Sequence, residues 1–178
     1  MQQQMKLDWQ WYLQICAILN IKMFKSLSYS IIFTLIDQTS KWFILEKLHL
    51  DVIGYYDVYS PFLSFKIGWN TGINFGLFAE SHELMRWVLI IISIGICLFL
   101  LRWSRKLTGN FSPILVGLVI GGAIGNVIDR IRFGAVIDFL NLSCCGIQNP
   151  YIFNIADIFV FIGLLPLILF SERFQKDT

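Results

Sequence analysis

Four stretches of mostly apolar residues, each long enough to cross a lipid bilayer as a helix, dominate this 178-residue chain. A bilayer core of about 30 Å is crossed by about 20 helical residues, and we expect such helices over about 27–48, 85–103, 108–128 and 151–170. Hydrophobic residues make up 56% of the chain and charged residues only 15%, which is unlike an ordinary soluble domain. The sequence therefore predicts an all-α membrane protein with four transmembrane helices.

The rest of the chain is arranged around these helices. We expect an N-terminal cytoplasmic extension over residues 1–25, one membrane domain over 26–172 and a cytoplasmic tail over 173–178. Within an outer region at about 50–80, apolar and other residues alternate over Phe62–Asn70, which predicts a strand of a small outer β-sheet. Lys and Arg favour the cytoplasmic side of a membrane, so the basic cluster at 102–106 indicates that both termini are cytoplasmic.

Charge and cysteine usage exclude two classes of function. The net charge is only +2 and the basic residues are scattered, so nucleic-acid binding is not expected. The four cysteines show no CxxC spacing, and the two histidines, His49 and His82, are far apart. The sequence therefore predicts no zinc site.

Ionisable residues inside apolar helices are candidates for function because burial of a charge in hydrocarbon is costly. Asp37 and Lys41 lie four residues apart in the first apolar stretch, so both project from one helix face and can form an ion pair. A structural salt bridge is the favoured interpretation, and catalysis is the alternative. Asn126, Asp129 and Arg130 lie at the outer end of the third helix, where anchoring of the helix end and substrate binding remain equally open.

Two further aspartates stand at the outer side without an obvious partner. Asp138 has apolar neighbours on both sides, and Asp157 follows Asn154 by three residues near the outer end of the fourth helix. If they meet, the two carboxylates share a proton. One can then act as a general base on a water molecule while the other polarises a carbonyl, which is a route to peptide hydrolysis.

Other functions are compatible with the same residues. The aspartates at 37, 138 and 157 are also suited to cation binding in a small transporter, or each carboxylate can be satisfied separately, by Arg130 or by backbone groups. A glycine-rich face on the third helix would also suit a non-catalytic assembly protein. The residues alone leave these alternatives open.

Five short motifs give the chain a resemblance to lipoprotein signal peptidase, the bacterial signal peptidase II family of aspartyl peptidases (family A8). They are Asp37-Gln-Thr-Ser-Lys41, Asn70-Thr-Gly72, Gly122-Ala-Ile-Gly-Asn126-Val-Ile-Asp129-Arg130, Val136-Ile-Asp138-Phe139 and Phe153-Asn154-Ile-Ala156-Asp157. The similarity runs from about Met23 to Phe170. What makes it specific is that all five occur in this order, on predicted helix ends.

The resemblance implies an enzyme that removes the signal peptide from diacylglyceryl-modified prolipoproteins by cutting on the amino side of the lipidated cysteine. It implies that Asp138 and Asp157 are the catalytic dyad, and that the site is lined or supported by Asn70, Asn126, Asp129, Arg130, Asn154, Asp37 and Lys41. We also expect a monomer in the bacterial inner membrane, in contact with lipids, with its active site at the outer face. Neither a metal nor an organic cofactor is expected.

Overall fold

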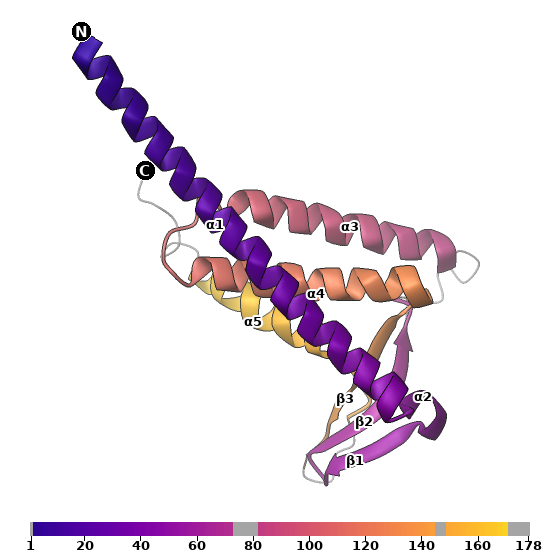
Figure 1. The fold of residues 1–178 in the computed structure, drawn as a ribbon. Coiled ribbons are helices and arrows are strands. Elements are labelled where there is room, and N and C mark those ends of the chain that lie inside the picture. Colours follow the sequence, from indigo (N-terminus) through magenta and orange to yellow (C-terminus); the bar gives the residue numbers. More distant parts are fainter. Residues whose placement is uncertain (1, 73–81, 145–148, 171–178) are drawn as a thin grey trace.

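The computed structural model describes residues 2–72, 82–144 and 149–170, and for residues 2–20 only the course of the helix. Helices dominate it, and a small sheet stands at one end of the helix bundle (Figure 1). The elements in chain order are α1 (Gln2–Trp42), the π-helical turn η1 (Phe43–Lys47), α2 (Leu50–Ile53), β1 (Tyr55–Tyr59), β2 (Leu63–Asn70), α3 (His82–Trp103), α4 (Ser112–Phe133), β3 (Val136–Leu142) and α5 (Ile155–Leu169).

Helix α4 is the centre of the bundle, with α1, α3 and α5 packed around it. Its glycines allow this close packing. A Cβ on Gly121 would lie 2.8 Å from the carbonyl oxygen of Ser30 on α1, and a Cβ on Gly122 would meet the backbone of Ala156 on α5. The small-residue face predicted for the third helix is therefore occupied by α1 and α5, which explains its sequence without an external partner.

By length and composition, two helices among the described residues can cross a membrane, Glu83–Trp103 and Ser112–Phe133. Helix α5 is apolar but has only 15 residues, and α1 carries the buried charges of Asp37 and Lys41. The boundaries also differ from the sequence-based ones. The first helix does not continue in α form to residue 48, because it changes to a π-helical turn after Trp42.

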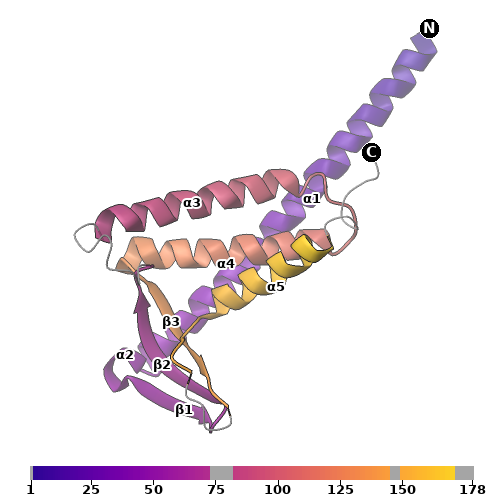
Figure 2. The ribbon, with the colours of Figure 1, turned by 180° about the vertical axis from the view of Figure 1, so that it is seen from behind.

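The sheet has the strand order β1-β2-β3, and both neighbouring pairs are antiparallel. The predicted strand at Phe62–Asn70 corresponds to β2. One side of the sheet packs on η1 and on α2 through a core of Ile44, Leu50, Ile137 and Phe139. The strands run across the direction of the helices, at the end of the bundle where α4 stops and α5 begins (Figures 1 and 2). The sheet thus carries residues of β2 and β3 to the ends of α4 and α5.

Candidate active site

Asp138 lies on β3, and its carboxylate is held between two amide side chains. Asn154 Nδ2 donates to Asp138 Oδ1 at 2.6 Å, and Asn70 Nδ2 donates to Asp138 Oδ2 at 3.1 Å. Asp138 is only 4% exposed. Asn70 reaches it from the end of β2, where its own side-chain oxygen accepts the N–H of Gly72 at 2.8 Å. Both carboxylate oxygens are therefore fixed by donors from two other parts of the chain.

Asp157 is fixed by the way in which α5 begins. Asn154 is the N-cap of α5, and its Oδ1 accepts the N–H of Asp157 at 2.9 Å while Asp157 Oδ2 accepts the N–H of Asn154 at 3.3 Å. This reciprocal pair is a capping box, a common way of satisfying the free N–H groups of a first helical turn. Capping alone would explain an aspartate here, so a further role has to rest on what else the carboxylate meets.

Asn154 connects the two aspartates. Its side-chain amide donates to Asp138 and its backbone N–H donates to Asp157. Asn126 on α4 completes the connection, because its Nδ2 donates to Asp157 Oδ1 at 3.0 Å and its Oδ1 accepts from Asn154 Nδ2 at 3.2 Å. The two carboxylates predicted from the sequence to lie at one depth are thus brought to the same asparagine. The described structure shows no direct hydrogen bond between them.

A buried ion cluster lies behind Asn126. Lys41 Nζ contacts Asp37 Oδ2 at 2.8 Å and Asp129 Oδ2 at 2.6 Å, and it donates to Asn126 Oδ1 at 3.2 Å. Asp37 Oδ1 in turn accepts the N–H of Ala156 in the first turn of α5 at 3.0 Å. The sequence-based preference for an Asp37–Lys41 salt bridge therefore agrees with the geometry. The cluster also joins α1 to α4 and α5, and through Asn126 it contacts the residues that hold Asp138 and Asp157.

Gln38 belongs to this cluster, although the sequence analysis did not include it among the site residues. Its Nε2 donates to Asp129 Oδ1 at 2.9 Å and to Asp37 Oδ2 and the carbonyl oxygen of Gly125, both at 3.2 Å. The signal was present in the sequence as an uncharged polar residue within an apolar helix. The site expected from the sequence rests on the ionisable residues of that helix, so it does not include Gln38.

Arg130 supplies a positive group at the edge of the site. Its Nη1 donates to the carbonyl oxygen of Asn126 at a long 3.5 Å, and its buried Nε has no hydrogen-bond partner among the described residues. A Cβ on Gly72 would lie 3.9 Å from Arg130 Nη2, so the guanidinium lies beside the Asn70–Gly72 turn. The structure therefore brings together all nine residues that the sequence predicts for the site.

The protonation of Asp138 is shifted by this environment. Its pKa is raised from 3.8 to about 6, chiefly because burial disfavours the charged form. The hydrogen bond from Asn70 opposes the rise, and the negative charge of Asp157 adds to it. A carboxyl that exchanges its proton near pH 6, beside a second carboxylate, is suited to general acid–base chemistry on a water molecule.

An apolar groove leads away from Asp157 along α5. It has a volume of about 310 Å³ and is lined by Asp157, Val160, Phe161, Leu164, Leu165 and Ile168.

A more polar cavity lies near the other end of the sheet and includes none of the predicted site residues. Among the residues that the structure describes, no three His, Cys, Asp or Glu side chains gather as a metal site would require.

The chain is similar to known proteins of one family. Residues 29–173 match the family described as signal peptidase (SPase) II, Peptidase_A8. The lipoprotein signal peptidase of Methylorubrum extorquens (strain PA1) is 40% identical over 64% of this chain, and the chain spans just under two thirds (66%) of that relative's length. The lipoprotein signal peptidase of Rhodopseudomonas palustris (strain CGA009) is 36% identical over 78% of this chain and 85% of the relative.

A solved structure, described as a bacterial membrane enzyme determined by the in meso method at 1.9 Å resolution, has a similar fold. It is 28% identical to this chain, with a TM-score of 0.67, and the match covers 86% of this chain and 94% of the other. A similar overall fold is thus present in an experimentally determined membrane enzyme.

Proposed function

The chain belongs to the signal peptidase II family of peptidases, and from this premise we propose that it removes the signal peptide from diacylglyceryl-modified prolipoproteins. The cut is on the amino side of the lipidated cysteine. Asp138 and Asp157 are the proposed catalytic dyad. The observation that carries this assignment is the pair of hydrogen bonds from Asn154, one to each carboxylate.

The proposed reaction uses one proton shared by the dyad. The ionised carboxylate takes a proton from a water molecule as the water oxygen attacks the scissile carbonyl carbon, and the protonated carboxyl hydrogen-bonds to the carbonyl oxygen. The tetrahedral intermediate then collapses. The bond from carbon to nitrogen breaks, and the departing cysteine nitrogen takes a proton from the dyad. Because the shared proton belongs to the pair, neither aspartate is assigned permanently as acid or base.

The remaining polar residues have proposed roles in holding substrate or the dyad. Asn70 and Asn154 fix Asp138, and Asn126 fixes Asp157. Arg130, whose Nε is unpaired within the described part of the chain, is placed to donate to carbonyl groups of the substrate backbone. Lys41, with its partners Asp37 and Asp129, holds the ends of α1, α4 and α5 together beneath the site.

The apolar groove on α5 supports a substrate that arrives within the membrane. A signal peptide is hydrophobic, and the acyl chains of the modified cysteine stay in the lipid, so the scissile bond is held near the headgroups. The groove begins at Asp157 and continues along lipid-facing residues such as Phe161 and Ile168, which are 66% and 61% exposed. An enzyme with this site need not draw its substrate out of the bilayer.

We further propose four membrane spans, formed by α1, α3, α4 and α5, with both termini cytoplasmic and the sheet outside. Arg102, Arg105 and Lys106 at the α3–α4 connection support this orientation. The orientation is tested by introducing single cysteines into a variant that has no native cysteines. Val52, on α2, is 79% exposed, so Val52→Cys should be labelled when a membrane-impermeant thiol reagent is added to intact cells. Lys106→Cys should be labelled only after permeabilisation, and the reverse pattern would exclude this orientation.

The function is tested with purified protein in detergent and a diacylglyceryl prolipoprotein. Asp138→Asn and Asp157→Asn should each abolish cleavage, and a chelator should have no effect. Asp51→Asn, which changes an exposed carboxylate on α2, is the matched control and should leave cleavage intact. Full activity in either dyad variant would contradict the assignment of the catalytic residues.

A further inference from the structure

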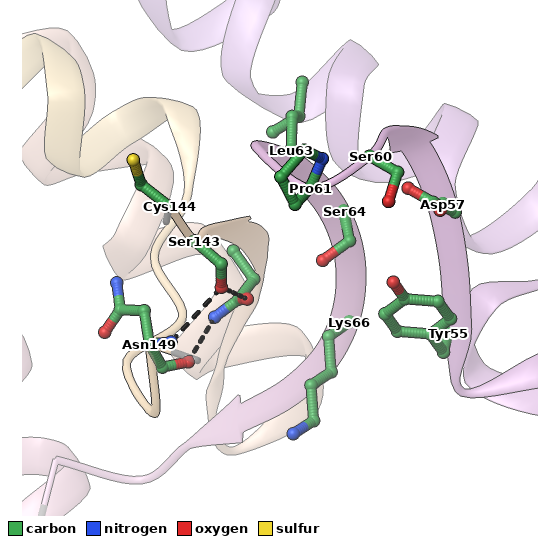
Figure 3. Close-up of a pocket in the computed structure, with 11 residues that line it drawn as sticks. Tyr55, Asp57, Ser60, Pro61, Leu63, Ser64, Lys66, Ser143, Cys144 and Asn149 are labelled. Carbon is green, nitrogen blue, oxygen red and sulfur yellow. Dashed lines mark hydrogen bonds between the residues drawn. The ribbon is translucent and has the colours of Figure 1, made fainter. Parts of the chain in front are cut away.

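A polar cavity of about 520 Å³ lies at the end of the sheet farthest from α4, and the proposed peptidase chemistry does not use it. Strand β2 lies between its two walls, which are β1 on one side and the segment after β3 on the other (Figure 3). The lining residues are Tyr55, Asp57, Ser60, Pro61, Leu63, Ser64, Lys66, Asn141, Ser143, Cys144 and Asn149. The cavity therefore contains both signs of charge together with several hydroxyl and amide groups.

One wall of the cavity is held in place by its own hydrogen bonds. Asn141 Nδ2 donates to the carbonyl oxygen of Asn149 at 2.8 Å, and Ser143 Oγ donates to Asn141 Oδ1 at 3.2 Å. The N–H of Asn149 donates to Ser143 Oγ at 3.2 Å (Figure 3). These polar groups bond to one another and hold the wall in place. A ligand would therefore be bound mainly by the other side chains of the cavity.

The two charged side chains that line the cavity, Lys66 and Asp57, are available to bind a ligand. Tyr55 pairs with Lys66 and Asp57 pairs with Ser64 across β1 and β2, so all four side chains lie on one face of the hairpin. The side chains of Lys66 and Asp57 make no ion pair and no hydrogen bond with any other described residue. A free ammonium and a free carboxylate in one polar cavity suit a ligand that itself carries both charges.

The position of the cavity indicates where such a ligand comes from. The tip of the β1–β2 hairpin reaches back along the bundle to about the level at which α5 begins (Figures 1 and 2). At this tip Tyr59 and Phe62 stack with ring centroids 5.8 Å apart, and they are 66% and 47% exposed. Exposed aromatic rings at the end of a membrane bundle are typical of the lipid headgroup layer.

We propose that the cavity binds the headgroup of a zwitterionic phospholipid that carries a primary ammonium, namely the phosphoethanolamine group. Lys66 binds the phosphate, and Asp57 accepts hydrogen bonds from the ammonium. A quaternary choline group cannot donate such bonds and is usually held by several aromatic rings, whereas Tyr55 is the one aromatic residue among the described lining residues. The proposal rests on the proposed outer-surface position of the sheet and not on the peptidase chemistry.

The substrate chain is a less suitable occupant. Asp138 and Asn141 are three residues apart on β3, and side chains alternate between the two faces of a strand. A peptide bound at Asp138 would therefore have to pass to the opposite face of the sheet before it reached Asn141. A lipid headgroup beside the hairpin tip needs no such path.

The test measures lipids retained by the full-length protein, using native mass spectrometry after titration with phospholipids that have identical acyl chains. Wild type should retain the ethanolamine lipid over the choline lipid by on the order of fivefold. Lys66→Ala should weaken retention of both lipids, and Asp57→Asn should remove the preference between them. Lys47→Ala, whose ammonium lies 5.3 Å from the Trp42 ring and outside the cavity, is the matched control and should behave as wild type.

Several results would overturn the proposal. These are the absence of a headgroup preference in wild type, unchanged lipid retention in both cavity variants, and equally tight binding of soluble phosphoethanolamine without acyl chains. A Lys66→Ala variant that raises KM for prolipoprotein without altering lipid retention would identify a peptide site instead. Asp138→Asn separates this inference from the proposed function, because it should lose cleavage and keep the lipid preference.

Discussion

Replacing Asp138 by asparagine should make the protein more stable at neutral pH while it removes activity. The carboxylate of Asp138 is buried at 4% exposure, and its pKa is raised from 3.8 to about 6, mainly by that burial. A raised pKa means that the folded state binds the proton more tightly than the unfolded state does. The stabilising contribution of this group is therefore complete below about pH 3.8 and is lost as the pH rises through about 6.

The size of the effect follows from the shift. About two pH units correspond to ~3 kcal/mol of folding free energy lost by wild type above pH 6, at ~1.4 kcal/mol per unit. Asparagine carries no charge, but one of its two polar atoms is a donor and cannot accept the hydrogen bond from Asn70 Nδ2. That loss costs about 1 kcal/mol. The variant should thus be more stable by roughly 2 kcal/mol at pH 7.5, and close to wild type at pH 4.5.

Thermal unfolding in detergent at the two pH values measures this difference. Asp138→Asn should raise Tm by a few degrees at pH 7.5 and have little effect at pH 4.5. Asp51→Asn, an exposed carboxylate on α2, serves as the control and should not change the pH dependence of Tm. A lower Tm for Asp138→Asn at pH 7.5, or a difference from wild type that does not vary with pH, would refute the argument from burial.

Two further predictions concern neighbours of the dyad. Asn70→Ala removes a hydrogen bond that favours the ionised form of Asp138. The alkaline limb of the profile of kcat/KM against pH should therefore move to higher pH, by about half a pH unit to one unit. An unchanged limb, or a limb at lower pH, would argue against a role for that bond. Lys41→Met leaves two buried carboxylates without their cation and should lower stability by about 3 kcal/mol or more. Denaturation in detergent measures this, and an unchanged Tm would show that the cluster is dispensable.

The helices were predictable because long apolar stretches mark them in the sequence. Two of the three strands, β1 and β3, were not predictable. Strand β2 alternates in sequence, so its prediction is confirmed to within a residue. Strand β3 is buried almost throughout, and all five residues of β1 are exposed. Neither of these strands shows the period of two that marks a strand with one buried face. Only the pairing with β2 reveals them.

The candidate site was predictable as a set of residues but not as a geometry. The order of the motifs singled out Asp138 and Asp157, and apolar neighbours marked both as unusual. Nothing in the sequence showed that one asparagine would bond to both carboxylates, because that depends on how α5 begins beside β3. Gln38 lay outside the expected site for a different reason, because it carries no charge, although a polar residue within an apolar helix was a signal in the sequence.

The position of Asn154 has a consequence for a peptidase that is made inside the membrane it works in. Asp138 comes from the sheet and Asp157 from α5, and both depend on the N-cap of that last helix. Without the docked N-terminus of α5, the two carboxylates lack the asparagine that bonds to both of them. Docking of this last helix is therefore the step of folding that brings together the two aspartates of the proposed dyad.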